Sequence, residues 1–378
     1  MSPFGMAIVL PVIPEIVERF DSGYSAAQFV VSGYLLGIAV AQPAIGFLCD
    51  RFGRRPVMLG GLATFVVASI GLSVAATLPQ LIALRVLQAV GAGAGSVVSR
   101  AVVQDTCTAE TGTRAMSRLT IGLGVAPVVA PMAGGWLAAV GGADAIFLAT
   151  AALGVVVLSR LAYALPETRD TGAEAPGWSA WFGGYRRLLV SRPFVGYTLV
   201  FGFVQGGFFA FLAVGAAVFE SSFGIGPAAF GLIWGAMTIA FVVGATVGGR
   251  LSVSTLSRYV FPTGAWLTPV AGLALLVLTR FVGAYPGTVL LPILLMMTLS
   301  GLVMPAVLAG PVYHHPDIAG TSAGLSSALG LVVGSSFTIA SGMLYAGAFE
   351  PIAVLIFVAT ILTALSSLLV SHSGVTAR

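Results

Sequence analysis

The feature that most constrains this chain is a series of long apolar stretches that follow one another with only short polar breaks. A helix that crosses a bilayer needs about 20 apolar residues, whereas a barrel strand shows about 10 residues of alternating polarity. The length and continuity of the stretches therefore predict an all-α membrane protein. We expect twelve transmembrane helices, near residues 3–18, 26–48, 56–76, 79–104, 116–139, 143–164, 194–218, 228–249, 259–279, 287–309, 319–346 and 351–370.

The composition excludes water-soluble functions. Of the 378 residues, 58% are hydrophobic and only 8% are charged, whereas soluble domains carry about 25% charged residues. A soluble enzyme and a disordered chain do not fit, and a net charge of +4 without a long basic run does not suit a nucleic-acid binder. The 49 glycines and 20 prolines permit close packing and kinks in a membrane bundle.

The placement of arginine predicts the orientation. All 17 basic residues are arginine. With both termini in the cytoplasm, every arginine falls on the cytoplasmic side except Arg19 and Arg280, which fall outside, and Arg85, which falls within a span. This distribution follows the positive-inside rule. Cys49 and Cys107 then lie at the cytoplasmic face, where we expect unpaired thiols that bind no metal.

A long polar segment divides the chain near its middle. We expect residues 165–192 to form a cytoplasmic linker between two six-helix halves, 1–164 and 193–378. The first apolar stretch is short for a crossing, so we expect the first helix of residues 1–164 to be truncated. Glycines of the second span recur 198 positions later in the eighth. The matched positions are Gly33, Gly37 and Gly46 with Gly231, Gly235 and Gly244. The recurrence favours two related halves with a substrate site between them.

The loop between the second and third spans reads Gly46-Phe-Leu-Cys-Asp50-Arg51-Phe-Gly53-Arg54-Arg55. A positive-inside loop would account for the arginines alone, but the ordered G-x-L-x-D-R-x-G-R-R pattern is much rarer. It resembles the signature loop of the major facilitator superfamily. The resemblance implies that fold, transport by alternating access, and a conformational gating role for these residues. It also implies that Asp50 faces the N-terminus of the eleventh span, a charge–dipole contact worth roughly 0.3–1 kcal/mol.

A charged residue lies inside the fourth span. Arginine within a span costs about 2.5–3.5 kcal/mol on insertion scales, so it is retained where it lines a wet cavity or meets a partner. Snorkelling to the outer interface is the alternative for Arg85. The span-4 motif of the same superfamily, arginine followed by glutamine and glycine, resembles Arg85, Gln88 and Gly91, which implies a role of Arg85 and Gln88 in proton coupling.

The fifth span carries two prolines four positions apart. Pro127 and Pro131 share a helix face, and Gly134 and Gly135 let another helix approach. Packing alone would also explain this pattern. It resembles the antiporter motif of proton-linked drug exporters, with Ala130 where a glycine is usual. The motif favours export over import.

Four further segments narrow the resemblance: 99–105, 126–135, 165–168 and 319–323. They are similar to the Bcr/CflA-type drug-resistance transporters, which export antibiotics in exchange for protons across the bacterial inner membrane. That family carries an aspartate in span 1, where this chain has Ala7. The acids nearest to membrane depth are Glu15, Asp105 and Glu220, and which group is protonated stays open.

For the substrate cavity we expect Tyr34, Gln42, Gln205, Phe208 and Phe209, because aromatic walls with a few polar groups suit an amphipathic compound. Core or lipid-facing aromatics are the alternative. The expected partners are a small molecule, protons and the lipid bilayer, with no cofactor, metal or nucleic acid, and the chain is expected to be monomeric. No catalytic constellation is apparent, so no enzyme is predicted. Without lysine, a phosphate-binding loop cannot form. An exporter of a native metabolite and an uncoupled facilitator stay open, and a membrane enzyme or receptor is the least supported.

Overall fold

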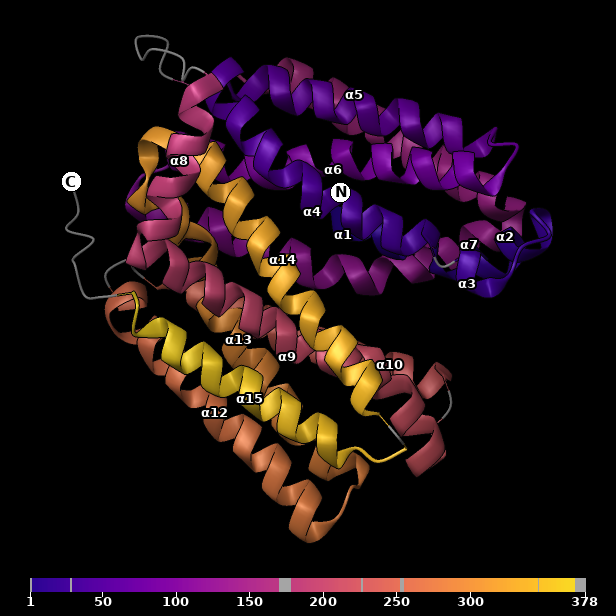
Figure 1. The fold of residues 1–378 in the computed structure, drawn as a ribbon, viewed down its shortest axis with the longest axis vertical. Coiled ribbons are helices and arrows are strands. Elements are labelled where there is room, and N and C mark those ends of the chain that lie inside the picture. The colour runs from indigo at the N-terminus through magenta and orange to yellow at the C-terminus, as the bar shows by residue number, and fades with distance from the viewer. Residues whose placement is uncertain are drawn as a thin grey trace. The chain divides into compact units, whose positions relative to one another are not determined.

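The computed structural model describes residues 2–27, 29–169, 178–225, 227–251, 255–345 and 347–370, and every regular element in these ranges is helical (Figure 1). Contacts group the chain into two compact units. Unit 1 contains Met1–Thr106, Val125–Tyr185 and Asp317–Ala328. Unit 2 contains Cys107–Gly124, Arg186–Pro316 and Leu329–Arg378. The division into sequence halves 1–164 and 193–378 stays a prediction.

Unit 1 is built mainly from the first part of the chain. Its elements are α1 (Ser2–Ala7), η1 (Leu10–Val12), α2 (Ile13–Arg19), α3 (Tyr24–Ala27), α4 (Phe29–Phe52), α5 (Arg54–Ser73), α6 (Leu78–Thr106), most of α7 (Ala109–Ala164), the beginning of α8 (Trp178–Val190), and the first residues of α14 (Ala319–Leu344). Helix α6 packs against both α4 and α5.

The first apolar stretch is not the single helix that the sequence predicts over 3–18. It forms α1, the 3-10 turn η1 and α2, and Pro11 and Pro14 lie at the beginnings of η1 and α2. Proline lacks the N–H group that would continue a preceding helix. The stretch is therefore broken into three short elements.

Unit 2 is built mainly from the second part of the chain. It shares four elements with unit 1 and contains the beginning of α7, the end of α8, the first residue of η4 (Pro316–Ile318) and the later part of α14. Its other elements are α9 (Arg192–Phe223), α10 (Pro227–Arg250), the π-helical turn η2 (Leu256–Val260), α12 (Phe261–Val277), the π-helical turn η3 (Leu278–Val282), α13 (Pro286–His314) and α15 (Glu350–Ser367). In Figure 1, α9, α12, α13 and α15 lie side by side, and α13 also packs against α10.

Ten helices of the described residues are long and apolar enough to cross a membrane. The long helix α7 contains both the fifth and the sixth predicted spans, and its backbone leaves the helical conformation at Gly141 and Gly142, where Gly142 has a φ of 63°. The chain is therefore a multi-pass membrane protein. The number of twelve crossings stays a prediction.

Helix α8 lies in the segment that we expected to be a polar linker. One of its faces is buried, since Leu188 is fully buried and the Trp181 ring stacks on Phe47 with centroids 5.1 Å apart. Residues 170–177 of the expected linker lie outside the described residues. Aromatic and aliphatic residues at helical spacing could have revealed this helix.

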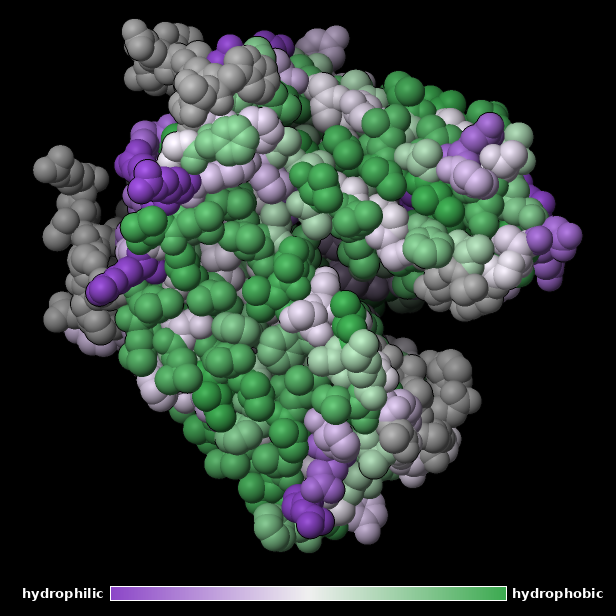
Figure 2. Space-filling view, in the orientation of Figure 1, coloured by the Kyte–Doolittle hydropathy of each residue, from purple (hydrophilic) through white to green (hydrophobic). Residues whose placement is uncertain are grey.

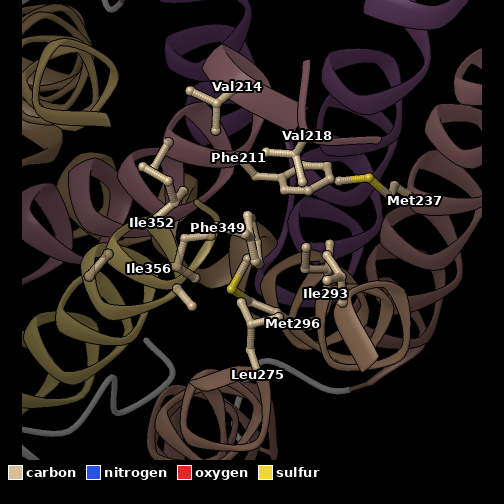
Figure 3. Packing of buried hydrophobic residues seen from close by; sticks show 14 of the residues in the cluster. Phe211, Val214, Val218, Met237, Leu275, Ile293, Met296, Phe349, Ile352 and Ile356 are labelled. Carbon is tan, nitrogen blue, oxygen red and sulfur yellow. The ribbon is translucent and has the colours of Figure 1, made fainter. Parts of the chain in front are cut away.

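Each unit has its own apolar core. In unit 1, side chains of α1, η1 and α2 pack with α7, and the buried members include Ile8, Ile16 and Phe147. In unit 2, residues such as Phe211, Met296 and those of α15 form the larger cluster (Figure 3).

The outer side chains of the helices are mostly apolar. Figure 2 shows hydrophobic residues over most of the visible face of both units, with hydrophilic residues gathered near helix ends. Large apolar side chains such as Val67 and Leu232 are 65% and 77% exposed. A surface of this kind fits lipid contact, since soluble proteins rarely expose large continuous apolar patches.

Candidate functional site

A buried ionic network lies where α4 meets α5 in unit 1. Arg54 Nε lies 2.7 Å from Asp105 Oδ2, and Arg54 Nη1 lies 3.6 Å from Asp50 Oδ1. Arg54 Nη1 also donates a hydrogen bond of 3.2 Å to the carbonyl oxygen of Cys49. Arg54 is 5% exposed, and both carboxylates are largely buried. Breaking such a pair would leave a buried charge without compensation, so the network holds the ends of α4, α5 and α6 together.

Glu167 follows the end of α7 and caps the beginning of α5. Its carboxylate accepts the backbone N–H groups of Arg54 and Arg55 at 2.9 and 3.2 Å, and those of Thr168 and Arg169 at 3.0 and 2.9 Å. Partial burial raises the pKa of Glu167, but these four donors outweigh it and hold the pKa below its usual range. An anion at a helix N-terminus is favoured by the unpaired amides and by the helix dipole.

Gly53 makes this capping contact possible. Its φ of 100° lies in the region that side chains disfavour, and a Cβ atom there would overlap the Glu167 carboxylate. Arg55 Nη2 donates a hydrogen bond of 2.9 Å to the carbonyl oxygen of Ala162. The Arg51 guanidinium lies 5.5 Å from the centre of the Phe52 ring. The structure thus brings Asp50, Arg54 and Arg55 into one network, whereas the Arg51 guanidinium lies against a ring.

Asp50 also contacts the beginning of α14. Its Oδ1 and Oδ2 accept the backbone N–H groups of Gly320 and Thr321 at 2.8 and 2.6 Å. Helices leave their first amides without partners, so the carboxylate supplies acceptors where α14 needs them. A Cβ atom on Gly46 would overlap the carbonyl of Gly320, so glycine permits the close approach of α4 and α14.

Arg85 lies inside α6 and is fully buried. Its Nε donates a hydrogen bond of 3.2 Å to the carbonyl oxygen of Val30. Its Nη1 donates hydrogen bonds of 3.0 Å to the carbonyl oxygen of Gly5 and of 2.5 Å to Gln88 Oε1. The guanidinium lies 4.3 Å from the centre of the Tyr34 ring, a cation–π arrangement. Complete burial does not fit snorkelling to the outer interface.

The contacts of Arg85 continue through Gln88. Gln88 Nε2 donates a hydrogen bond of 2.7 Å to Ser69 Oγ, and the Ser69 hydroxyl donates one of 2.6 Å to the carbonyl oxygen of Phe65. This chain of hydrogen bonds fixes Gln88 so that its oxygen faces the guanidinium. No described carboxylate lies within 4.0 Å of Arg85.

The proline motif of the fifth span lies in α7. Pro127 and Pro131 are inside the helix, and Gly134 faces the carbonyl of Ile8, which a Cβ atom would overlap. Gly135, by contrast, has open space where its Cβ atom would be. Within unit 1, the motif therefore permits the close approach of the broken first segment to α7.

The residues expected to line a substrate cavity divide between the units. Tyr34 and Gln42 are buried in unit 1, and Gln42 Nε2 donates 3.2 Å to Ser96 Oγ. Gln205, Phe208 and Phe209 lie on α9 in unit 2. Phe208 packs against the apolar core there, with its ring 5.5 Å from that of Trp234. This packing fits the alternative of a core aromatic for Phe208.

A small cavity in unit 2 uses other residues of α9. Phe203, Val204 and Gly207 form one wall, and hydroxyl groups come from α12, α13 and α15. Those hydroxyl residues are Thr268, Ser300, Thr360 and Thr363. No sequence pattern separates these four hydroxyl residues from the other serines and threonines within apolar helices.

The acids expected nearest to membrane depth have partners elsewhere. Glu15 accepts the backbone N–H of Ala143 at 2.9 and 3.0 Å, beside the break in α7. Asp105 pairs with Arg54 and accepts 3.0 Å from the Thr168 hydroxyl. The side chain of Glu220 lies outside what the structure describes. Sequence reasoning missed the pairing of Asp105 and the capping role of Glu167, because both partners are distant in the chain.

A multi-pass helical bundle with a capped loop aspartate and a buried arginine has the features of a membrane transporter rather than those of an enzyme. The sequence profile of the Major Facilitator Superfamily matches residues 1–339, and the chain belongs to that superfamily. It is therefore a transporter that acts on small molecules.

The chain is similar to transporters named for drug resistance. Multidrug resistance protein D of Escherichia coli (strain K12) is 28% identical over 341 residues, which cover 89% of this chain and 82% of that protein. The chloramphenicol resistance protein of Pseudomonas aeruginosa is 32% identical over 296 residues, or 74% of this chain and 67% of that one. These relatives are of the Bcr/CflA type.

Among solved structures, the chain resembles the proton:xylose symporter XylE bound to 6-bromo-6-deoxy-D-glucose. The TM-score is 0.77 at 15% identity, and the match covers 97% of this chain and 91% of that one. This likeness establishes the all-helical fold of the superfamily.

Proposed function

We propose that this protein exports small amphipathic compounds, drugs and antibiotics among them, by proton antiport with alternating access. The observation that carries the proposal is the contact of Asp50 with the first amides of α14, within the network of Arg54 and Asp105. A carboxylate that caps a distant helix stabilises one conformation and is released in another, which is what a transport cycle requires. Similarity to proteins named for multidrug and chloramphenicol resistance supports the substrate class.

In this proposal the loop from Gly46 to Arg55 gates the cycle, and Arg85 with Gln88 couples it to protons. The segment from Pro127 to Gly135 favours the exporting direction, and the protein acts as a monomer in the bacterial inner membrane with both termini cytoplasmic. Tyr34, Gln42, Gln205, Phe208 and Phe209 are the proposed substrate contacts.

Uncoupled facilitated transport is the second candidate. It is favoured by Ala7, which occupies the place of a membrane aspartate, and by the engagement of Glu15 and Asp105 in other contacts. A transporter without a protonatable group in its pathway needs no proton to complete its cycle.

Proteoliposomes with an imposed pH gradient separate the two candidates. We expect gradient-driven accumulation of chloramphenicol, and its loss in Arg85→Ala, because that change removes the buried cation and leaves the Gly5 carbonyl without its donor. Arg280→Ala is the matched control, since Arg280 is exposed and pairs with Glu350 at 3.1 Å. Flux that is independent of the gradient would contradict antiport and favour facilitated transport.

A further inference from the structure

One face of α6 carries a polar stripe within unit 1. We define the α6 stripe as the polar residues Arg85, Gln88, Ser96 and Arg100, together with the small residue Ala92 that lies between them. At about 100° per residue these positions fall within a sector of roughly 120°, and the two arginines are about 22 Å apart along the helix axis. The arginines, Gln88 and Ala92 are at most 5% exposed, and Ser96 is half-buried. The stripe therefore places a positive charge at each end of a largely buried face.

Neither arginine of the stripe has a carboxylate partner among the described residues. The guanidinium of Arg85 meets neutral acceptors only, and its Nη2 is buried without an acceptor. Arg100 donates 3.0 Å from Nε to the carbonyl of Ser96 and from Nη2 to the Ser327 hydroxyl. No described acid lies within 4.0 Å of either one.

Arg54 provides the comparison within the same unit. It is 5% exposed, as Arg100 is, yet it pairs with Asp105 and Asp50. Arg54 therefore receives its counter-charge from described acids of the chain, whereas Arg85 and Arg100 meet neutral acceptors. A buried cation without one is costly, so its retention indicates that the counter-charge comes from another molecule.

The geometry points to an acidic substrate: the transported compound carries a carboxylate or sulfonate that Arg85 and Arg100 bind in turn. This rests on the proposed function and specifies its preferred substrate class, since a neutral compound such as chloramphenicol lacks the acid and should be transported less readily than an acidic one. Guanidinium groups present paired N–H donors that match the two oxygens of such an acid, and Nη2 of Arg85 is the donor that is still available. Both arginines are covered here, so the acid reaches them in a state in which the covering segments move away.

The direction of transport agrees with this charge. The inside of a bacterial membrane is electrically negative, so an anion that leaves the cell moves down the potential. Export of an acidic compound therefore needs no membrane carboxylate such as the one that Ala7 replaces. A cationic compound would instead have to pass two buried positive charges.

Matched sets of probes test the substrate class. For each of several aromatic scaffolds, such as naphthalene, uptake into proteoliposomes is compared for the carboxylate, its neutral methyl ester and the trimethylammonium analogue. We expect transport of the carboxylate at concentrations at least tenfold lower than those of the other two. Arg85→Gln and Arg100→Gln should each remove this preference, while Arg280→Gln leaves it unchanged.

Arg85→Lys keeps the positive charge but loses the paired N–H donors, so it should retain part of the preference for the carboxylate. It also serves as the control for the case in which Arg85→Gln fails to fold. Transport of esters or ammonium analogues as readily as acids would overturn the proposal and leave the exporter function standing. A preference for acids that survives both glutamine variants would also overturn it. Absence of transport for every probe and for chloramphenicol would contradict the proposed function itself.

Discussion

At the scale of single residues, the carboxylates of unit 1 act mainly on backbone amides. Asp50 accepts hydrogen bonds from two backbone amides at the beginning of α14, and Glu167 accepts hydrogen bonds from two at the beginning of α5. Each carboxylate joins segments that are far apart in the sequence. Removal of one negative charge should therefore loosen a specific junction and leave the helices themselves intact.

Asp50→Asn should open the junction of α4 with α14. The charge–dipole contact is worth about 1 kcal/mol, which corresponds to roughly a fivefold shift in population. Buried Cys49 reports the opening, because a Cβ atom on Gly320 would lie 2.9 Å from its Cβ. In a Cys107→Ser background, we expect maleimide to modify Cys49 roughly fivefold faster in Asp50→Asn than in the parent.

Asp144→Asn is the matched control for this experiment. Asp144 is about half-exposed and pairs with Arg19 at 2.6 Å, so its loss should cost little. Equal modification rates in Asp50→Asn and the parent would contradict a gating role for the Asp50 contact.

Glu167 predicts a dependence of stability on pH. Its pKa is lowered in the folded protein, so its contribution to stability is present above the unfolded value of about 4.3 and is lost as the pH falls through the folded pKa. The melting temperature of the wild type should therefore fall more between pH 6 and pH 3 than that of Glu167→Gln. Parallel curves for the two proteins would rule out this contribution.

At the scale of elements, glycines determine which helices approach most closely. Gly134 of α7 faces the carbonyl of Ile8 in the broken first segment, whereas the neighbouring Gly135 faces open space. The two positions share a helix and a sequence context. They form a natural pair for testing close packing apart from helix propensity.

Gly134→Ala should destabilise the protein and Gly135→Ala should not. Both changes gain up to about 1 kcal/mol in helix propensity, but the first forces apart α7 and the segment of Ile8, at a cost of about 1–3 kcal/mol. Thermal unfolding in detergent should give a lower melting temperature for Gly134→Ala and an unchanged or higher one for Gly135→Ala. The same shift in both variants would indicate that the first segment does not depend on this contact.

At the scale of the whole molecule, the arginine distribution predicts the topology. Tyr163 lies at the end of α7 on the predicted cytoplasmic side, and Tyr285 lies before α13 on the predicted outer side; they are 94% and 60% exposed. In a Cys49→Ser, Cys107→Ser background, Tyr285→Cys should react with a membrane-impermeant maleimide in intact cells. Tyr163→Cys should react only after permeabilisation, and the reverse pattern would invert the topology.

Much of the helical architecture could be predicted from the sequence, because hydropathy over a span of about 20 residues is a strong signal. Helix α8 was missed because its arginines and glycines made the segment read as polar. The neutral acceptors around Arg85 could not be foreseen, since they are mostly backbone carbonyls, which every residue has. The contact of Asp50 with α14 could be expected from the loop motif, whereas the pairing of Arg54 with Asp105 could not.

The two buried arginines differ in when their hydrogen-bond partners are synthesised. Gly5 and Val30 supply acceptors for Arg85, and Ser69 anchors its partner Gln88; all three precede α6 in the chain. They have left the ribosome by the time α6 emerges, and they can offset the roughly 2.5–3.5 kcal/mol that an arginine costs at a helix centre. The side-chain partner of Arg100, Ser327, is made 227 residues later. The hydrogen bond between Arg100 and Ser327 can therefore form only after α14 has been made.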